Sequence, residues 1–315
     1  MSAPFRILAL DGGGIRGAAT AQVLMELEQD LDDSLYDSFD LIAGTSTGGL
    51  IAIYLGAKKA SGQQIVDLYS ADNGRRIFDK SIWDRTLPLQ NEPKYDGGGK
   101  SDVIEQYLGD QPILSVEKPI LITGYDIISR KIAVFKSWGG SDSQYNPSLR
   151  EVGDITSAAP TYFPTVESSA EPTRWLVDGG LAANNPAMCA LTEALKLGKR
   201  LEDIELISVG TGIPTRGADE ADEVGRASQS WGGIEWLRHG LIDHLFAANT
   251  STCEYQCNAL LGDRHVRIDG PLTRAKDDLD DVSAGNIESL RRHGTEWYQQ
   301  QQPQIQALIR GSSEV

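Results

Sequence analysis

The segment Asp40-Leu41-Ile42-Ala43-Gly44-Thr45-Ser46-Thr47-Gly48-Gly49-Leu50-Ile51-Ala52-Ile53 decides the fold of this 315-residue chain. Residues 41–43 predict a short buried strand, and the apolar run over residues 50–55 predicts the start of a helix. Between them, Gly44-x-Ser46-x-Gly48 has the form of a nucleophile elbow, a sharp strand-to-helix turn that exposes a serine hydroxyl. Glycines flank such a serine because the adjacent backbone packs too closely for a Cβ atom. An ordinary Gly/Ser/Thr turn is the alternative, so the hypothesis depends on the rest of the chain.

The composition limits the classes of partner. Hydrophobic residues make up 40% of the chain and charged residues 23%, which is typical of a soluble globular protein. The net charge of −16 argues against nucleic acid as a partner, because phosphate binding needs a clustered basic face. The same charge disfavours strong electrostatic docking on anionic lipid. A neutral lipid or ester substrate is compatible with it.

The cysteines and the uncharged segments indicate a cytoplasmic protein without a metal site. Three cysteines cannot form a closed disulfide framework, and Cys253 and Cys257 have no second ligand pair nearby that would complete a zinc site. The first residues run into a strand without an apolar signal core. The long uncharged run over residues 41–57 is short for a membrane span and contains the elbow, so we interpret it as buried core.

A glycine-rich loop follows the first predicted strand, which covers residues 5–10. It reads Asp11-Gly12-Gly13-Gly14-Ile15-Arg16-Gly17 and opens a helix that continues to about Leu31. Gly12-x-Gly14-x-x-Gly17 formally matches the dinucleotide-binding fingerprint, with acidic residues 30, 32 and 33 downstream. Backbone N–H groups of such a loop bind an anion, which is a pyrophosphate in one hypothesis and the oxyanion of an ester under attack in the other.

Strand and helix patterns alternate through the rest of the chain. We interpret residues 72–100 and 214–231 as irregular surface segments, and we expect Pro303 to break the last helix. The pattern predicts one α/β domain over residues 1–315 with a mainly parallel sheet, a motif core at about 5–212 and a C-terminal helical part at about 233–310. The predicted strands cover residues 120–124, 131–135, 174–178, 204–209 and 265–268, and the predicted helices cover 61–69, 103–108, 155–159, 186–197 and 283–301, with two more helical stretches after residue 231.

Three sequence features lie at the ends of predicted strands. They are the Gly12–Gly17 loop, Ser46 and Asp178 in Asp178-Gly179-Gly180. Because the carboxyl ends of parallel strands meet at one edge of a sheet, we expect these features to form one site. The loop would supply hydrogen-bond donors, Ser46 a nucleophile and Asp178 a carboxylate, which are the parts of an acyl-transfer site.

Histidine is the part that the sequence does not place at this site. All four histidines, at positions 239, 244, 265 and 293, lie in the last quarter of the chain without a motif around them. A late histidine could complete a Ser…Asp…His order, so a triad is an alternative. The simpler hypothesis is a dyad of Ser46 and Asp178.

The combination of Asp11–Gly17, Gly44–Gly48 and Asp178–Gly180 resembles the patatin-like phospholipase family, and the stretches at residues 157–164 and 178–186 support the resemblance. The resemblance covers residues 5 to about 272. It implies a three-layer α/β/α fold and hydrolysis of lipid acyl esters by a Ser–Asp dyad. By the same resemblance Ser46 is the nucleophile, Asp178 is the base, and the amides of Gly12, Gly13 and Gly14 form the oxyanion hole. Arg16 stands in the family's basic position, where it either steadies a substrate anion or braces the loop. No cofactor or metal is implied.

Two other functions use the same motifs. An acyltransferase would form the same acyl-enzyme on Ser46 and pass the acyl group to an alcohol instead of water. A nucleotide-binding oxidoreductase would use the Gly12–Gly17 loop but leave the elbow unexplained. For the hydrolase the partner is a lipid or ester substrate, with transient contact at a membrane surface, and exposed aromatic residues on loops are the candidates for that contact. Tyr162 and Phe163 either line an apolar groove or fill the core.

Overall fold

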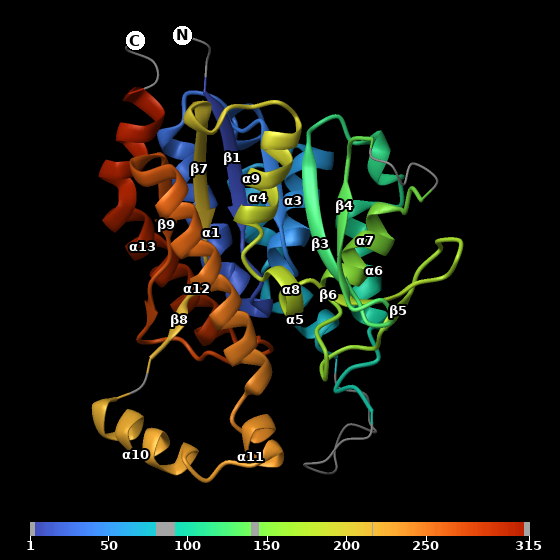
Figure 1. The fold of residues 1–315 in the computed structure, drawn as a ribbon, viewed down its shortest axis with the longest axis vertical. Coiled ribbons are helices and arrows are strands. Elements are labelled where there is room, and N and C mark those ends of the chain that lie inside the picture. The colour runs from blue at the N-terminus through green and yellow to red at the C-terminus, as the bar shows by residue number, and fades with distance from the viewer. Residues whose placement is uncertain (1–3, 80–91, 140–144, 216, 312–315) are drawn as a thin grey trace.

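Figure 1 shows the computed structural model, which describes residues 4–79, 92–139, 145–215 and 217–311. Within these residues eight strands form a central sheet in the order β5-β6-β3-β2-β1-β7-β9, with β4 paired to β3 on the side. A second, two-stranded sheet consists of β8 (Ile213–Pro214) and β10 (Pro271–Leu272). The strands of the central sheet are β1 (Phe5–Leu10), β2 (Leu41–Gly44), β3 (Ile120–Asp126), β4 (Lys131–Lys136), β5 (Val166–Glu167), β6 (Trp175–Asp178), β7 (Ile204–Val209) and β9 (His265–Ile268).

The centre of the sheet is parallel, as predicted, and one side of it is antiparallel. β1 pairs in parallel with β2 and β7, β2 with β3, and β7 with β9. β3 and β4 form an antiparallel hairpin, and β6 also runs antiparallel to β3. The helices are α1 (Gly17–Asp30), α2 (Leu35–Ser38), α3 (Thr47–Lys58), α4 (Gly62–Leu68), α5 (Ala71–Ile77), α6 (Gly98–Leu108), α7 (Leu149–Thr156), α8 (Gly180–Ala183), α9 (Ala187–Lys196), α10 (Ala218–Ser228), α11 (Gly233–Arg238), α12 (Leu241–Leu261) and α13 (Ala284–Gly311), with short 3₁₀ turns at Gly14–Arg16, Ile113–Ser115, Leu201–Asp203 and Gly262–Arg264.

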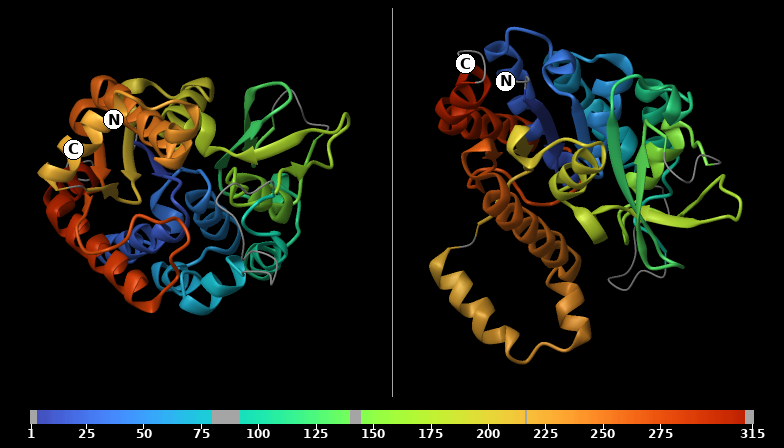
Figure 2. Two further views of the ribbon diagram at one scale, coloured as in Figure 1. Left: turned by 90° about the horizontal axis from the view of Figure 1, so that it is seen from below. Right: turned by 45° about the horizontal axis from the view of Figure 1, so that its top comes forward.

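Helices cover both faces of the sheet, which gives three layers (Figures 1 and 2). The alternation of side chains along a strand sends Leu8 and Leu10 of β1 into the larger core, among residues of α1, α3, α6 and α13. Ile7 and Ala9 point to the opposite face and pack against α9 and α12. Both sets are fully buried, so β1 is the apolar centre of the molecule. None of the described helices combines the length and the apolar character needed to cross a membrane.

Several predicted elements differ from the structure. The segment 214–231, predicted as a loop, contains the helix α10, because its alanines and glutamates favour a helix more than its glycines oppose one. The short helix expected at 155–159 is instead the end of α7, which starts at Leu149. Part of the irregular segment 72–100 is helical in α5 and α6, and residues 80–91 lie outside the described residues.

The prediction that Pro303 breaks the last helix is wrong. α13 runs through this proline to Gly311. Pro303 lies on the exposed face of the helix, where the carbonyl group that loses its hydrogen bond can be hydrated. On the opposite face, the buried side chains of Tyr298 and Ile305 hold both halves of the helix in the core, so packing outweighs the local cost of the proline.

Candidate active site

The segment around Ser46 is a strained strand-to-helix turn. β2 ends at Gly44 and α3 begins at Thr47, and Ser46 between them has φ 53° and ψ −123°. A positive φ is unfavourable for a residue with a side chain, so this conformation stores strain that the surroundings must hold. A Cβ atom on Gly44 would collide with the carbonyl oxygen of Gly48, and one on Gly48 would collide with that of Leu10. The structure therefore has the backbone geometry that the elbow motif predicts.

Asp178 reaches Ser46 by a route that the sequence argument did not foresee. β6 runs antiparallel to β3, so its carboxyl end does not belong to the parallel edge. β3 is longer than β2, and β6 turns back along its extension, which brings Asp178 opposite Gly124. Ile122 of β3 lies opposite Gly44, so Gly124 is level with the turn that holds Ser46. The expected neighbours are together, although the reason given for it was wrong.

The Asp178 carboxyl is buried, with 1% of its surface exposed. Its Oδ1 atom accepts a hydrogen bond from the Gly180 amide at 2.8 Å. Oδ2 makes no hydrogen bond of good geometry within the described residues, although the Ser46 hydroxyl is close enough to lower the pKa of the carboxyl. Burial is the larger influence, and the net result is a pKa raised to about 6. The Oδ2 atom is thus a buried acceptor without a fixed partner beside a serine.

The three glycine amides predicted to form the oxyanion hole differ in their hydrogen bonding. The Gly12 amide donates to the carbonyl oxygen of Asn184 at 3.1 Å, so it is already used. Gly13 and Gly14 line the pocket next to Ser46, and neither amide makes a hydrogen bond within the described part of the chain. Arg16 lies outside the pocket lining, and its Nε atom donates to the Gly13 carbonyl oxygen at 3.4 Å. Of the two roles considered for Arg16, the geometry supports bracing of the loop.

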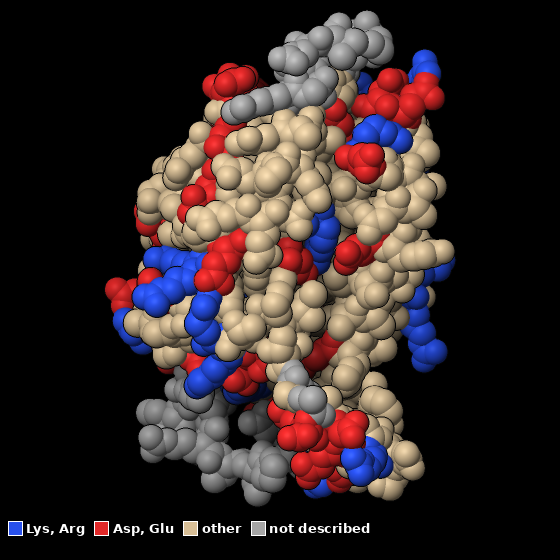
Figure 3. Space-filling view, turned by 90° about the vertical axis from the view of Figure 1, so that its left-hand side faces the viewer, with Lys and Arg blue, Asp and Glu red and all other residues tan. Residues whose placement is uncertain are grey.

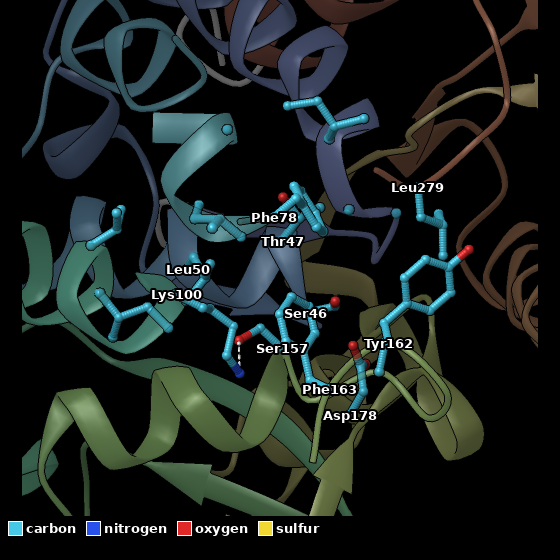
Figure 4. A pocket seen from close by; sticks show the side chains of 18 of the residues that line it. Ser46, Thr47, Leu50, Phe78, Lys100, Ser157, Tyr162, Phe163, Asp178 and Leu279 are labelled. Carbon is cyan, nitrogen blue, oxygen red and sulfur yellow. Dashed lines mark hydrogen bonds between the residues drawn. The ribbon is translucent and has the colours of Figure 1, made fainter. Parts of the chain in front are cut away.

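Ser46 and Asp178 open into one pocket of about 930 Å³, a volume that includes its open mouth (Figure 4). Its wall is mostly apolar, and Lys100 and Asp178 are the charged side chains among the described residues that form it. Tyr162 and Phe163 both line the pocket, and Phe163 is at the same time a buried residue, so the groove and core alternatives both apply to it. Apolar and aromatic side chains of the wall include Leu50, Leu68, Ile77, Phe78, Val103, Ile104, Tyr107, Leu108, Phe246 and Leu279.

None of the four histidines is among the described residues that line this pocket. His265 is buried between Ser208 and Asn258, and His293 stacks on Trp297. His239 stacks on Trp231, and His244 lies edge-on to Trp236, both away from the sheet. The geometry therefore gives no support to the Ser…Asp…His alternative.

A family model described as patatin-like phospholipase matches residues 8–191 of the sequence. This chain belongs to the patatin-like phospholipase family. Membership in this family makes it an enzyme that hydrolyses ester bonds, and lipids are the substrates that go with the family.

Curated relatives match over most of the chain. Patatin-like protein 1 from Oryza sativa subsp. indica is 30% identical over 324 residues, which cover 91% of this chain and 77% of the relative. The cGAMP-activated phospholipase from Pseudomonas aeruginosa is 30% identical over 297 residues, which cover 92% of this chain and 86% of that enzyme.

Solved structures confirm the α/β fold. Human GIVD cytosolic phospholipase A2, in complex with methyl gamma-linolenyl fluorophosphonate, superposes with a TM-score of 0.52 at 12% identity, covering 98% of this chain and 59% of the human chain. VipD from Legionella pneumophila superposes with a TM-score of 0.50 at 11% identity, covering 99% and 67%. At these identities the likeness concerns the fold alone.

In this member of the patatin-like family, three consecutive residues at the end of α7 connect the parts of the site. The Thr156 hydroxyl accepts a hydrogen bond from the Ser46 amide at 2.9 Å and donates to the Thr123 carbonyl oxygen at 2.7 Å. The Ser157 hydroxyl accepts from Lys100, and the Ala158 carbonyl oxygen accepts from the Asp178 amide at 3.0 Å. The segment Thr156–Ala158 thus holds the backbone of Ser46 and the backbone of Asp178 on one rigid support.

Lys100 is a pocket residue that the sequence analysis missed. Only 4% of its surface is exposed, and its Nζ atom donates to the Asp154 carbonyl oxygen at 2.9 Å and to Ser157 Oγ at 3.1 Å (Figure 4). Burial lowers the pKa of this ammonium group, and the carboxylates of Asp154 and Asp178 oppose that effect. Position 100 shares a helix face with the buried Val103 and Ile104, which is the signal that could have placed it inside.

Below the glycine loop lies a buried ion-pair cluster. Arg267 of β9 donates to both carboxylate oxygens of Asp11, at 3.1 and 2.6 Å, and to Asp269 at 2.8 Å. Burial raises the pKa of Asp11 to about 6 against the opposing effect of Arg267, so the carboxylate is charged at neutral pH. Because Asp11 is the first residue of the loop, this bidentate pair fixes the position from which the loop starts.

Proposed function

We propose that this chain cleaves acyl ester bonds of lipids through an acyl-enzyme on Ser46, with Asp178 as the general base. The observation that carries the proposal is the pairing of a strained serine with a buried carboxylate whose Oδ2 atom lacks a fixed partner, both on the wall of one apolar pocket. Neither feature is needed for a protein that only binds lipid. Family membership and the absence of a histidine from the described pocket wall support the dyad.

The reaction follows from these positions. The Ser46 Oγ atom attacks the ester carbonyl carbon, and its proton passes to Asp178 Oδ2. The amides of Gly13 and Gly14 stabilise the negative oxygen that forms, and loss of one such donor typically costs about 10²–10³ in rate. The intermediate collapses as the alcohol leaves with the proton from Asp178. Water, deprotonated by Asp178, then releases the fatty acid and restores Ser46.

The buried position of Asp178 adapts it to this role. An exposed aspartate, with a pKa of about 3.9, is a weak base, whereas the Asp178 pKa is raised to about 6 by burial. The nearby Ser46 hydroxyl, the hydrogen bond from the Gly180 amide and the charge of Lys100 limit the rise, so the carboxylate is charged at neutral pH and ready to accept a proton. We expect kcat/KM to fall as the pH drops below about 6.

The pocket indicates the substrate class. An acyl chain suits a wall built from leucine, isoleucine, valine and phenylalanine side chains, because its transfer from water is favoured by about 25 cal/mol per Å² of apolar surface. The ester carbonyl would lie between Ser46 and the loop, and the alcohol part of the lipid would face the open mouth.

Labelling with a fluorescent fluorophosphonate tests the proposal, together with hydrolysis of a p-nitrophenyl acyl ester. We expect wild-type protein to be labelled and active, and Ser46→Ala to lose both properties while its circular dichroism spectrum stays unchanged. Ser137→Ala is the matched control, since Ser137 has the same 9% exposure but lies outside the pocket. Labelling that persists in Ser46→Ala, or that is lost in Ser137→Ala, would contradict the assignment.

A further inference from the structure

The helices α10 and α11 are built unlike the rest of the molecule. No described side chain of either helix is buried, and Figure 1 shows them projecting below the body, joined to it by β8 on one side and α12 on the other. Figure 2 shows the same open arrangement from a second direction. Helices in proteins are stabilised mainly by packing of an apolar face, and the described residues of α10 and α11 bury no such face in this chain. Their presence therefore calls for another explanation.

The lower end of this arm exposes large apolar side chains. Ile234, Trp236 and Leu237 of α11 are 60%, 38% and 63% exposed, and Leu245 at the start of α12 is 50% exposed. We call these four residues the apolar tip. Single exposed apolar residues are common on protein surfaces, but four large ones on two adjoining helices form a patch that indicates an interaction site.

Aromatic contacts hold Trp236, and with it the apolar tip, in place. Trp231 meets Trp236 edge-on with ring centroids 5.2 Å apart, and it stacks on His239 at 4.0 Å. Trp236 in turn meets His244 of α12 edge-on at 6.0 Å. These contacts hold α11 against the start of α12 and leave Ile234 and Leu237 facing outward.

One helix, α12, contributes to both the apolar tip and the wall of the catalytic pocket. Phe246 follows Leu245 in α12 and lines the pocket. Its ring packs against Gly180, whose amide donates to Asp178. The helix that carries Leu245 of the tip therefore also supplies Phe246 to the pocket that contains Ser46.

We propose that the apolar tip docks on a lipid surface of zwitterionic phospholipid, so that the pocket mouth faces the lipid from which the substrate is drawn. This inference rests on the proposed function, because it supplies that site with its substrate. Tryptophan beside aliphatic side chains is typical of segments that lie in the headgroup region of a bilayer. Because α12 carries both Leu245 of the tip and Phe246 of the pocket wall, docking of the tip would bring the lipid to the same side of the molecule as the pocket.

Charge selects the kind of lipid surface. Asp219, Glu220, Asp222 and Glu223 lie on α10, the helix that precedes α11 in the arm, and Figure 3 shows acidic side chains gathered at this end of the molecule. Together with the net charge of −16, they repel an anionic bilayer within about a Debye length of 8–10 Å. A zwitterionic surface avoids that repulsion.

The size of the tip favours lipid over a second copy of the chain. A standard protein interface buries about 800 Å² on each partner. A large side chain offers about 200 Å² when completely buried, so four side chains that are roughly half exposed supply about half of that area. Shallow insertion into lipid requires no matching partner surface.

Co-sedimentation with vesicles of dialkyl ether phosphatidylcholine tests the inference, since these lipids contain no ester bond and are not consumed. We expect wild-type protein to bind them, and Ile234→Ser/Leu237→Ser to bind about tenfold more weakly. Leu195→Ser/Leu197→Ser is the control, because these residues are 44% and 46% exposed at the far end of α9 and should leave binding unchanged. Adding phosphatidylglycerol should weaken wild-type binding.

Hydrolysis of a short, water-soluble p-nitrophenyl ester separates this inference from the proposed function. The tip variant should match wild type on this ester and fall behind it on phosphatidylcholine vesicles. Absence of hydrolysis by wild type would contradict the proposed function without deciding the vesicle result. Equal vesicle binding by wild type and tip variant, or no binding by wild type, would overturn the docking inference. A wild-type dimer that the tip substitutions convert to a monomer in analytical ultracentrifugation would also overturn it, in favour of a second copy.

Discussion

The glycine loop and the α10–α11 arm lie at the same end of the molecule and are constructed in opposite ways. At the loop, Asp11 and Arg267 form a bidentate pair with no more than 9% of either side chain exposed. In the arm, Arg226 and Asp222 form a pair of similar length, 2.8 Å, with 77% and 74% exposed. The comparison shows that the distance between two charges does not tell how much their ion pair contributes to the stability of the fold. Water screens the exposed pair in the arm, so its loss costs little. Water cannot replace a lost partner in the buried pair, so the charge that remains destabilises the protein.

The largest expected effect comes from breaking the buried pair. Arg267→Met leaves the Asp11 carboxylate buried without its partner, and we expect the free energy of unfolding to fall by about 3–5 kcal/mol. Arg226→Met removes the exposed ion pair of the arm and should change the free energy of unfolding by less than about 1 kcal/mol. Urea unfolding of both variants measures the difference, and equal losses would show that the two regions are not distinct.

A second substitution tests the support of the elbow. Thr156→Val keeps the shape of the side chain but leaves the Ser46 amide and the Thr123 carbonyl group without their partner. We expect a loss of about 1–3 kcal/mol in stability and of about 10² in kcat/KM, because the serine is displaced from its productive position. Thr156→Ser retains the hydroxyl and should recover most of the activity. A fully active Thr156→Val variant would mean that the conformation of Ser46 does not depend on the Thr156 hydroxyl.

A third substitution should stabilise the protein. The folded-state pKa of Asp178, about 6, lies above its unfolded value of about 3.9, so the buried carboxylate opposes folding increasingly as the pH rises from about 4 to 6. Asp178→Asn removes this cost, and we expect it to raise stability at pH 7.5 by about 1–2 kcal/mol while abolishing turnover. The gain should shrink at pH 4.5. Urea unfolding at the two pH values checks the prediction, and a gain that is the same at both would assign it to packing instead.

The smallest effect is expected in the arm. Ile234→Ser/Leu237→Ser replaces exposed apolar side chains that belong to no core, so the free energy of unfolding should stay within about 0.5 kcal/mol of wild type. Thermal and urea unfolding give the comparison. A large loss would show that the arm is packed more firmly in solution than its exposure indicates.

Sequence reasoning succeeded where the structure requires a particular residue type at a particular position in a short segment. The collisions at Gly44 and Gly48 involve residues that are close in the chain or in adjacent strands, so the glycines appear as a readable motif around Ser46. Strands such as β1 and β7 are short runs of buried apolar residues, which composition reveals directly. The same holds for the alternation that assigns their side chains to the two faces of the sheet.

Sequence reasoning failed where the partner lies far away in the chain. The Thr156 hydroxyl accepts a hydrogen bond from the Ser46 amide, 110 residues away in the sequence. Lys100 donates hydrogen bonds to Asp154 and Ser157, which are more than 50 residues away. The direction of β6 depends on the path of the segment before it, which has no periodic pattern. The errors at α10 and at Pro303 are local instead. There the glycines and the proline were given more weight than the neighbouring residues that favour a helix.

The pairing of Asp11 with Arg267 spans 256 residues, nearly the whole chain, and β1 cannot complete its own pairing until β7 has been made. The segment that matches the family model, residues 8–191, contains neither β7 nor Arg267. During synthesis the elbow serine is therefore translated long before the loop beside it can be anchored, and contacts of such high sequence separation form slowly. We expect the nascent chain to remain inert toward esters until its last quarter has folded, which spares the surrounding lipid from an immature enzyme.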